Sequence, residues 1–150
     1  MTVKLCVVSV LLIFPVLLFG QDVPAEFVET TEVAPNKTIL KSIFFGGGSA
    51  YIDEEQVEEL QEFIYAVDNI NRYEILVHSF TDNIGSRQYN QWLSQQRSEA
   101  VIWELEQLAI PIDLLLKADF GEDNPIYNNQ TYQGQLHNRR VDIILRPLSF

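Results

Sequence analysis

One arginine interrupts the apolar stripe of the longest helix that the sequence predicts. Arg97 falls four residues after Leu93 and four before Val101. A guanidinium on such a face must be paired or must face a cleft, because an unpaired buried charge is very costly. Two interpretations stay open: Arg97 borders a ligand cleft, or it snorkels at the edge of a sheet, with Glu104 on the same face as a partner. The apolar members of the stripe are Tyr89, Leu93, Ala100, Val101, Leu105 and Leu108.

Few other residues have the types and spacing of a catalytic or metal site. The chain has two histidines, His78 and His137, and lacks the common serine-hydrolase and zinc-protease motifs. His78 lies inside a predicted strand without a second ligand at a suitable spacing, so we interpret it as a packed or edge histidine. The three glycines at 46–48 are not followed by the Lys-Ser/Thr of a phosphate-binding loop, and a turn or strand-edge bulge is the better interpretation. We therefore expect no enzyme activity, no metal and no cofactor.

Composition limits the functional classes further. The 150 residues carry 10 Lys+Arg against 21 Asp+Glu, a formal net charge of −11. A nucleic-acid-binding protein normally has a basic face, because phosphate neutralisation supplies most of its affinity, so we expect no nucleic-acid partner. Hydrophobic residues make up 47% and charged residues 21% of the chain, which are ordinary values for a folded domain.

The first 38 residues are expected to lie outside the folded domain. Residues 1–20 combine one early lysine, an apolar run of about 13 residues and a final small residue, which is typical of a secretory signal peptide. The alternative is an uncleaved anchor, but this run is shorter than the ~20 residues that span a bilayer. Cys6, the one cysteine, would be removed with the leader. Residues 21–38, with two prolines and no sustained period, predict a flexible or extended tether.

The remainder alternates strands and helices. Asp53 with Gln56, and later Ser86, supply the N-caps of two amphipathic helices, of which the second ends near Leu108 before Pro111. A short helix or turn is expected at 131–137. The pattern predicts an α+β fold in the order β-α-β-α-β-β, with helices on one side of a mixed sheet. The predicted strands are 38–45, 73–80, 114–120 and 141–146.

The motifs around these elements resemble those of the OmpA-like C-terminal domains. The spacing T-D-x-x-G-x-x-x-Y-N-x-x-L-S-x-x-R is matched from Thr81 to Arg97. Phe45 followed by Ser49-Ala50 is similar to the family's first strand and turn. The resemblance covers about residues 39–146, and it implies an OmpA-like sandwich domain at 39–150. The second half of the signature is matched by Gly121-Glu122, Pro125, Asn129, Thr131, Gly134 and Asn138-Arg139-Arg140-Val141.

The resemblance also implies a ligand and the residues that bind it. Members of this family bind peptidoglycan non-covalently, and their Asp and Arg hold the free end of meso-diaminopimelate in the stem peptide. These positions correspond to Asp82 and Arg97. A carboxylate accepts hydrogen bonds from the ammonium of that end, and a guanidinium can take its carboxylate bidentately. Further ligand-binding positions implied by the match are Thr81, Asn90, Gly85 and, through its backbone, Gly48.

Two functional interpretations remain. In the first, the protein is exported to the periplasm, where it is associated with the cell wall or the outer membrane and anchors or links the envelope to the wall. In the second, the same fold binds outer-membrane or periplasmic proteins and has lost wall binding. Several positions differ from the family pattern: glycines stand at 47 and 48 where Asp or Asn is common, and Ser79, Phe80, Asp119 and Gln135 replace other family residues.

Overall fold

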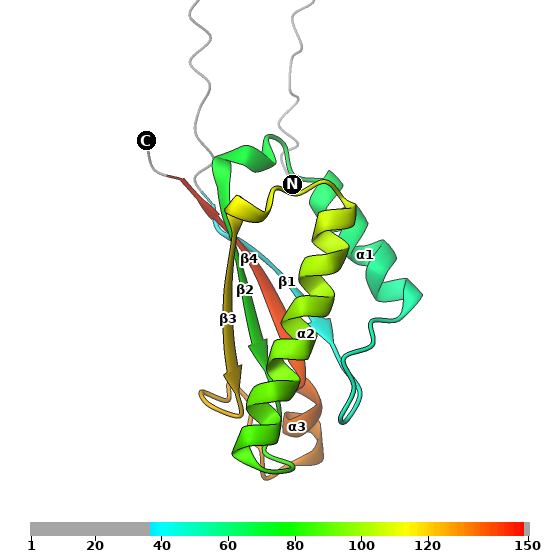
Figure 1. The fold of residues 1–150 in the computed structure, drawn as a ribbon, viewed down its shortest axis with the longest axis vertical. Coiled ribbons are helices and arrows are strands. Elements are labelled where there is room, and N and C mark those ends of the chain that lie inside the picture. Colours follow the sequence, from blue (N-terminus) through cyan, green and yellow to red (C-terminus); the bar gives the residue numbers. More distant parts are fainter. Residues whose placement is uncertain (1–36, 149–150) are drawn as a thin grey trace, which may run out of the picture. The chain divides into compact units, whose positions relative to one another are not determined.

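The computed structural model describes residues 37–148, which contain four strands and three α-helices (Figure 1). Two short 3-10 turns, Ile70–Arg72 and Ile112–Leu114, precede the second and third strands. The expected signal peptide and most of the expected tether lie outside the described residues. The elements in chain order are β1 (Ile39–Phe44), α1 (Glu54–Tyr65), β2 (Tyr73–Phe80), α2 (Arg87–Gln107), β3 (Leu115–Gly121), α3 (Tyr132–Asn138) and β4 (Arg140–Pro147).

The strands form one mixed sheet in the order β1-β4-β2-β3. The last strand, β4, lies in the interior and pairs antiparallel with β1 and with β2, while β2 and β3 pair in parallel. The pairing of β2 with β3 is irregular at Ser79 and Phe80. This irregularity falls directly before Thr81 and Asp82, at the end of the sheet where the candidate site lies.

The first helix begins where the sequence predicts it. The Asp53 carboxylate accepts a hydrogen bond from the backbone N–H of Gln56, and Glu54 and Glu55 place negative charge at the positive end of the helix dipole. The Gln56 side chain also bonds both the N–H and the C=O of Phe44. It thereby ties the start of α1 to the end of β1 across the intervening loop.

The second helix carries the site residues on its buried side. Ser86 caps it by accepting from the N–H of Tyr89, and Ala109, with a φ of 58°, ends it before Pro111. Tyr89 was expected in the apolar stripe, but it is 41% exposed. Asn90, one residue later, is buried in its place, so the buried side of the first turn of α2 is polar. The buried residues of α2 are Asn90, Leu93, Ser94, Arg97, Ser98, Val101 and Leu105.

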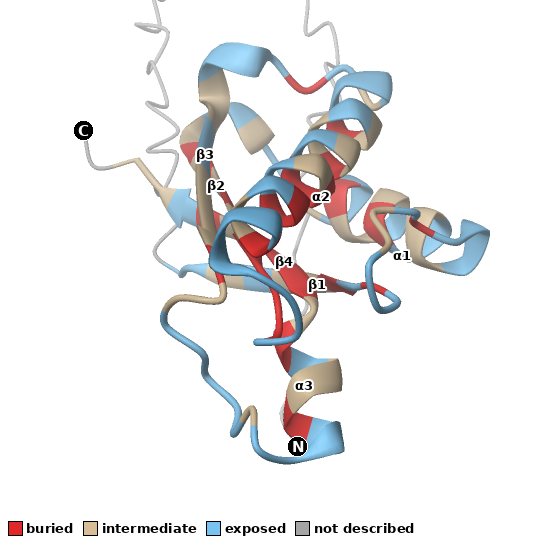
Figure 2. Ribbon diagram, turned by 60° about the horizontal axis from the view of Figure 1, so that its bottom comes forward, coloured by how far each residue is buried: buried red, intermediate tan, exposed pale blue. Residues whose placement is uncertain are grey.

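The hydrophobic core lies between the sheet and the helices α1 and α2 (Figure 2). Its centre combines alternate residues of β2 and β4, such as Ile75 and Ile143, with Leu60 of α1 and Leu105 of α2. Burial of these side chains stabilises the fold by about 1.5–3 kcal/mol each relative to exposure. Within residues 37–148, no helix is both long and apolar enough to cross a membrane.

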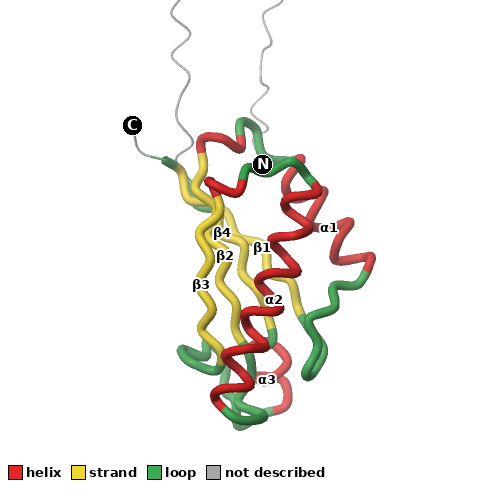
Figure 3. The backbone as a smooth tube through the Cα atoms, in the orientation of Figure 1, coloured by secondary structure: helices red, strands yellow, loops and turns green. Residues whose placement is uncertain are grey.

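The predicted fold class is confirmed: helices pack on a mixed four-stranded sheet (Figure 3). The segment expected to be a short helix or a turn is the helix α3. This helix is held by contacts with the loop before it. The Asn138 side chain bonds both backbone groups of Tyr127 and the side chain of Asn129.

Candidate functional site

A pocket of about 250 Å³ lies at the end of the sheet where β2 runs into its following loop. Its walls come from the turn after β1, the loop after β2, the first turns of α2 and the residue that follows α3. Segments far apart in the chain therefore meet here. The lining residues are Gly47, Gly48, Asp82, Ile84, Gly85, Tyr89, Leu93 and Arg139.

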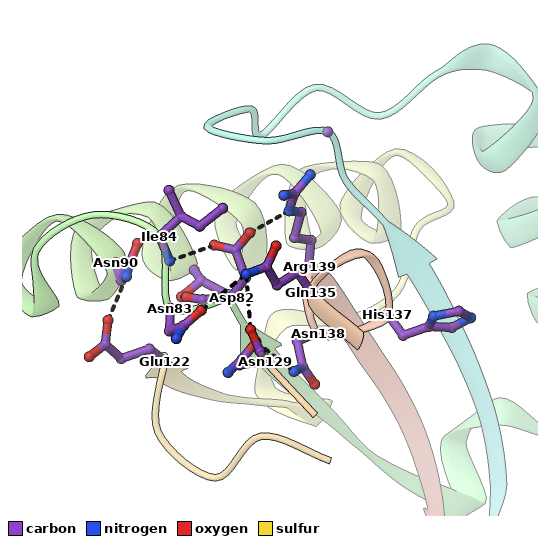
Figure 4. A network of polar contacts seen from close by, with 12 residues as sticks. Asp82, Asn83, Ile84, Asn90, Glu122, Asn129, Gln135, His137, Asn138 and Arg139 are labelled. Atoms are coloured by element: carbon purple, nitrogen blue, oxygen red, sulfur yellow. Dashed lines mark hydrogen bonds and ion pairs between the residues drawn. The ribbon is translucent and has the colours of Figure 1, made fainter. Parts of the chain in front are cut away.

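Asp82 is the acidic centre of this pocket. Its Oδ2 accepts a hydrogen bond of 2.6 Å from Nε of Arg139, and its Oδ1 accepts one of 3.2 Å from the N–H of Ile84 (Figure 4). Both members of the ion pair are mostly buried. Each carboxylate oxygen has two lone pairs, so Asp82 can accept a further hydrogen bond from a ligand cation.

Arg139 presents its remaining donors to the same pocket. Among the described residues, its two Nη nitrogens have no hydrogen-bond partner, and Nη1 lies 3.3 Å from the position that a Cβ on Gly47 would occupy. Glycine at 47 therefore leaves room for this guanidinium. The pocket thus holds a carboxylate and, beside it, a guanidinium edge that is free to bind an anion.

Arg97 lies behind the pocket wall, and its side chain is 1% exposed. It donates to three backbone carbonyls: Nε to Ser49 at 2.9 Å, Nη1 to Phe80 at 3.0 Å and Nη2 to Gly46 at 2.9 Å. The guanidinium also lies over the ring of Phe45, 5.1 Å from its centroid. Arg97 therefore joins the turn after β1 to the end of β2, the two segments that carry the glycine wall and Asp82.

The charge of Arg97 acts on the site as well. Burial lowers the pKa of Arg97 to about 10, and the nearby negative charge of Asp82 opposes that shift. The guanidinium is therefore protonated at neutral pH. Three of its five N–H groups bond the carbonyls, which leaves two donors. No ion pair joins it to Glu104 within the described part of the chain, so the proposed pairing with Glu104 is wrong.

Two glycines of the site have positive φ angles. Gly48 has a φ of 65° and Gly85 a φ of 110°, a region that other residues adopt at a cost. A Cβ at Gly48 would lie 3.3 Å from the Tyr89 hydroxyl, and a Cβ at Gly85 would lie 3.1 Å from the Tyr89 ring. Both glycines therefore let the backbone pass close to Tyr89, which forms one side of the pocket.

The remaining predicted residues, Thr81 and Asn90, are buried next to the site. Thr81 is buried: its N–H bonds the carbonyl of Gly121 at 2.7 Å, and its hydroxyl bonds the carbonyl of Asp82 at 2.8 Å. Asn90 donates to Glu122 at 2.6 Å, while its buried Oδ1 has no partner. That oxygen lies 3.5 Å from the position of a Cβ on Gly85. Thr81 thus fixes the loop that carries Asp82, and Asn90 leaves an acceptor beside the pocket wall.

Of the six predicted site residues, Gly48, Asp82 and Gly85 line the pocket, while Thr81, Asn90 and Arg97 are buried beside it. Arg139 was not predicted as a site residue, although the Asn138-Arg139-Arg140 motif contains it. The signal was present in that motif, but which of its two arginines reaches Asp82 depends on the conformation after α3. Arg140 instead bonds Asp142 and lies over the ring of Phe80.

A metal site is not found in the described residues, where no three His, Cys, Asp or Glu side chains gather in a suitable cluster. His78 packs edge-on against Phe120, with ring centroids 5.3 Å apart. Burial lowers the pKa of His78, while Asp142 opposes that shift. This histidine lies on the sheet and takes no part in the pocket.

Two curated proteins each match 71% of this chain in sequence. Outer membrane protein A of Citrobacter freundii is 31% identical over 108 residues, 71% of this chain and 44% of that protein. The probable lipoprotein YiaD of Escherichia coli is 29% identical over 107 residues, 71% of this chain and 49% of that protein. This chain therefore matches less than half of the length of either relative.

Solved structures agree with the fold. The peptidoglycan-associated lipoprotein of Burkholderia pseudomallei superposes with a TM-score of 0.65 at 25% identity, over 70% of this chain and 89% of that one. The C-terminal domain of Helicobacter pylori MotB gives a TM-score of 0.62 at 23% identity, over 73% and 86%, which is a likeness of fold. The sequence profile of the OmpA family matches residues 44–139. The chain belongs to the OmpA family.

Proposed function

We propose that this domain binds peptidoglycan without covalent chemistry and so links its envelope partner to the cell wall. The observation that carries the proposal is the pairing, in one small pocket, of the Asp82 carboxylate with an Arg139 guanidinium whose Nη groups are free among the described residues. Such a pocket offers one anionic and one cationic contact side by side. It therefore suits a small zwitterion attached to a longer chain.

The free end of meso-diaminopimelate is a zwitterion of this kind. Its ammonium would donate to Asp82, and its carboxylate would accept from the Nη groups of Arg139. The charges then alternate in sign along the series Asp82, ligand ammonium, ligand carboxylate and Arg139, so each ligand charge has an opposite neighbour. Because the pocket is partly buried, these contacts are screened less than surface ion pairs.

Arg97 has a different part in this proposal from that of Asp82. It positions the two pocket walls through its three carbonyl contacts, and its charge adds to the positive potential felt by the ligand carboxylate. The Asn90 Oδ1, buried without a partner, is a second acceptor near the ammonium. Gly48 and Gly85 supply backbone groups where a side chain would narrow the pocket.

The relatives support an envelope role. One structural relative is named a peptidoglycan-associated lipoprotein, and the sequence relatives are named as an outer membrane protein and a probable lipoprotein. We propose that this protein likewise works in the envelope, after export, as a binding module and not as an enzyme. What it links to the wall is a separate property of the protein.

The test is co-sedimentation of the purified protein with diaminopimelate-type sacculi. Asp82→Asn keeps the size of the side chain but removes the charge, so we expect the bound fraction to fall to background. Glu99→Gln is the matched control, because it makes the same chemical change in an exposed ion pair with Lys117, away from the pocket. It should sediment like wild type.

The opposite outcome favours the second function. If folded Asp82→Asn sediments like wild type, the pocket is not the wall site. If wild-type protein does not sediment at all, the domain is better interpreted as a module for outer-membrane or periplasmic proteins.

A further inference from the structure

Two aromatic rings continue the pocket onto the outer surface of α2. Tyr89 lines the pocket, and its ring lies 5.7 Å from that of Trp92, centroid to centroid. Trp92 is 51% exposed, although a tryptophan buries a large apolar area when it finds a partner. The ring pair therefore forms a ridge that begins at the pocket and ends in solvent.

A groove of about 640 Å³ lies beyond this ridge, between α2 and the loop after β3. Arg87 and Asp123 close part of it with an ion pair of 2.6 Å, so their charges are mutually neutralised. The Gln91 amide donates to the carbonyl of Asp119 at 2.9 Å and holds the β3 end against the helix. The groove is lined by Arg87, Gln88, Gln91, Trp92, Gln95 and Asp123.

Two glutamines leave their amide groups free in this groove. Gln88 and Gln95 are exposed, and within residues 37–148 their side chains have no hydrogen-bond partner. They lie four residues before and three residues after Trp92, on the same side of the helix. The groove therefore combines a flat apolar ring with uncharged donors and acceptors around it.

This combination suits a pyranose ring that carries N-acetyl groups. The C–H face of such a ring packs on an aromatic ring through dispersion and burial of apolar area, while amide side chains can bond its hydroxyl and acetamido groups. A neutral sugar also avoids the repulsion that an acidic ligand would meet on a chain of net charge −11. The groove contains no uncompensated cation that would select a phosphate or a carboxylate.

We infer that this groove is a glycan subsite, which binds a sugar of the same wall fragment whose diaminopimelate enters the pocket. The inference rests on the proposed function, because continuity with the pocket through Tyr89 identifies the occupant. The few residues between the diaminopimelate and the sugar span about 10 Å when extended, which is longer than the 5.7 Å between the centroids of the Tyr89 and Trp92 rings. The peptide would pass over Tyr89, and the sugar would pack on the ring of Trp92.

The test compares two soluble ligands by isothermal titration calorimetry. One is the free diaminopimelate-type stem peptide, and the other is the same peptide with its disaccharide attached. Wild type should bind the disaccharide peptide about tenfold more tightly. Trp92→Ala should remove that advantage and leave the affinity for the free peptide unchanged, and Gln95→Ala should remove part of it.

Trp103→Ala is the matched control. Trp103 is also on α2, is 57% exposed and lines a different hollow, so this variant should keep the full advantage of the disaccharide. Equal affinity of wild type for the two ligands would overturn the glycan subsite, as would a Trp92→Ala variant that behaves like Trp103→Ala. Failure of the free peptide to bind wild type would instead refute the proposed function, so the two failures are distinguishable.

Discussion

The guanidinium of Arg97 is the main polar link between the two segments that wall the pocket. Its three carbonyl acceptors belong to Gly46 and Ser49 on one side and to Phe80 on the other. A planar fork with five donors can satisfy acceptors that lie in several directions, which a single ammonium cannot do. Burial of this cation is therefore tolerable because three of its donors bond backbone carbonyls.

Arg97→Lys tests this positioning role. Lysine retains the charge but cannot reach all three carbonyls, so at least one buried acceptor loses its partner, at about 1–3 kcal/mol for each. We expect urea denaturation to give a free energy of unfolding lower by about 2–4 kcal/mol. The control Arg87→Lys, an exposed arginine in a surface ion pair, should change it by less than about 0.5 kcal/mol. Equal stability of the two variants would contradict the role.

Asp82 and Arg139 allow a test of coupling within the pocket. Removing either partner leaves the other mostly buried without its ion pair, so Asp82→Asn and Arg139→Gln should each destabilise the domain by about 1–3 kcal/mol. The double variant should cost less than the sum, because the second change removes no further pair. Thermal or chemical denaturation of the four proteins measures this coupling energy. Strict additivity would show that the ion pair contributes nothing to stability.

At the scale of elements, the sequence predicts most of what positions the site. The helix caps at Asp53 and Ser86 and the strand expected at 73–80 are local signals, and the structure confirms them. The placement of β4 between β1 and β2 depends on long-range pairing that no local pattern specifies. The pairing of Arg139 with Asp82 is likewise not specified by a local pattern, because it depends on how α3 joins β4.

The short helix α3 is held by close backbone packing at Gly134. A Cβ there would lie 2.0 Å from the carbonyl oxygen of Asn128, so Gly134→Ala must displace the helix or the loop. We expect a loss of about 2–4 kcal/mol in the free energy of unfolding and weaker binding to sacculi, because Arg139 directly follows α3.

Gly46→Ala is the control for this prediction. A Cβ at Gly46 would meet only the Cβ of Ser49, at 3.8 Å, and its φ is not positive. This variant should therefore retain stability within about 0.5 kcal/mol and should bind normally. A Gly134→Ala protein as stable as Gly46→Ala would mean that the α3 contact is not needed.

At the scale of the whole molecule, the proposed function requires an acidic chain to bind a wall polymer that itself carries carboxylates. General attraction between opposite charges cannot supply this affinity, because the chain has a net charge of −11. Local pairing of charges inside a partly buried pocket can, since it is screened little by salt. The affinity for a ligand is therefore expected to depend on which charged groups that ligand carries.

Stem peptides with lysine in place of diaminopimelate test this dependence. Lysine has the ammonium for Asp82 but lacks the second carboxylate, so Arg139 loses its ligand partner, at a cost of roughly 1–3 kcal/mol. At about 100 times its dissociation constant, the diaminopimelate peptide should stabilise the domain by about 2.7 kcal/mol. That raises the melting temperature by about 10 °C, measurable by thermal-shift assay. The lysine peptide at the same concentration should give a much smaller rise, and Asp82→Asn should give none with either peptide. Equal rises with both peptides would show that the carboxylate is not recognised, even if the wall is still bound.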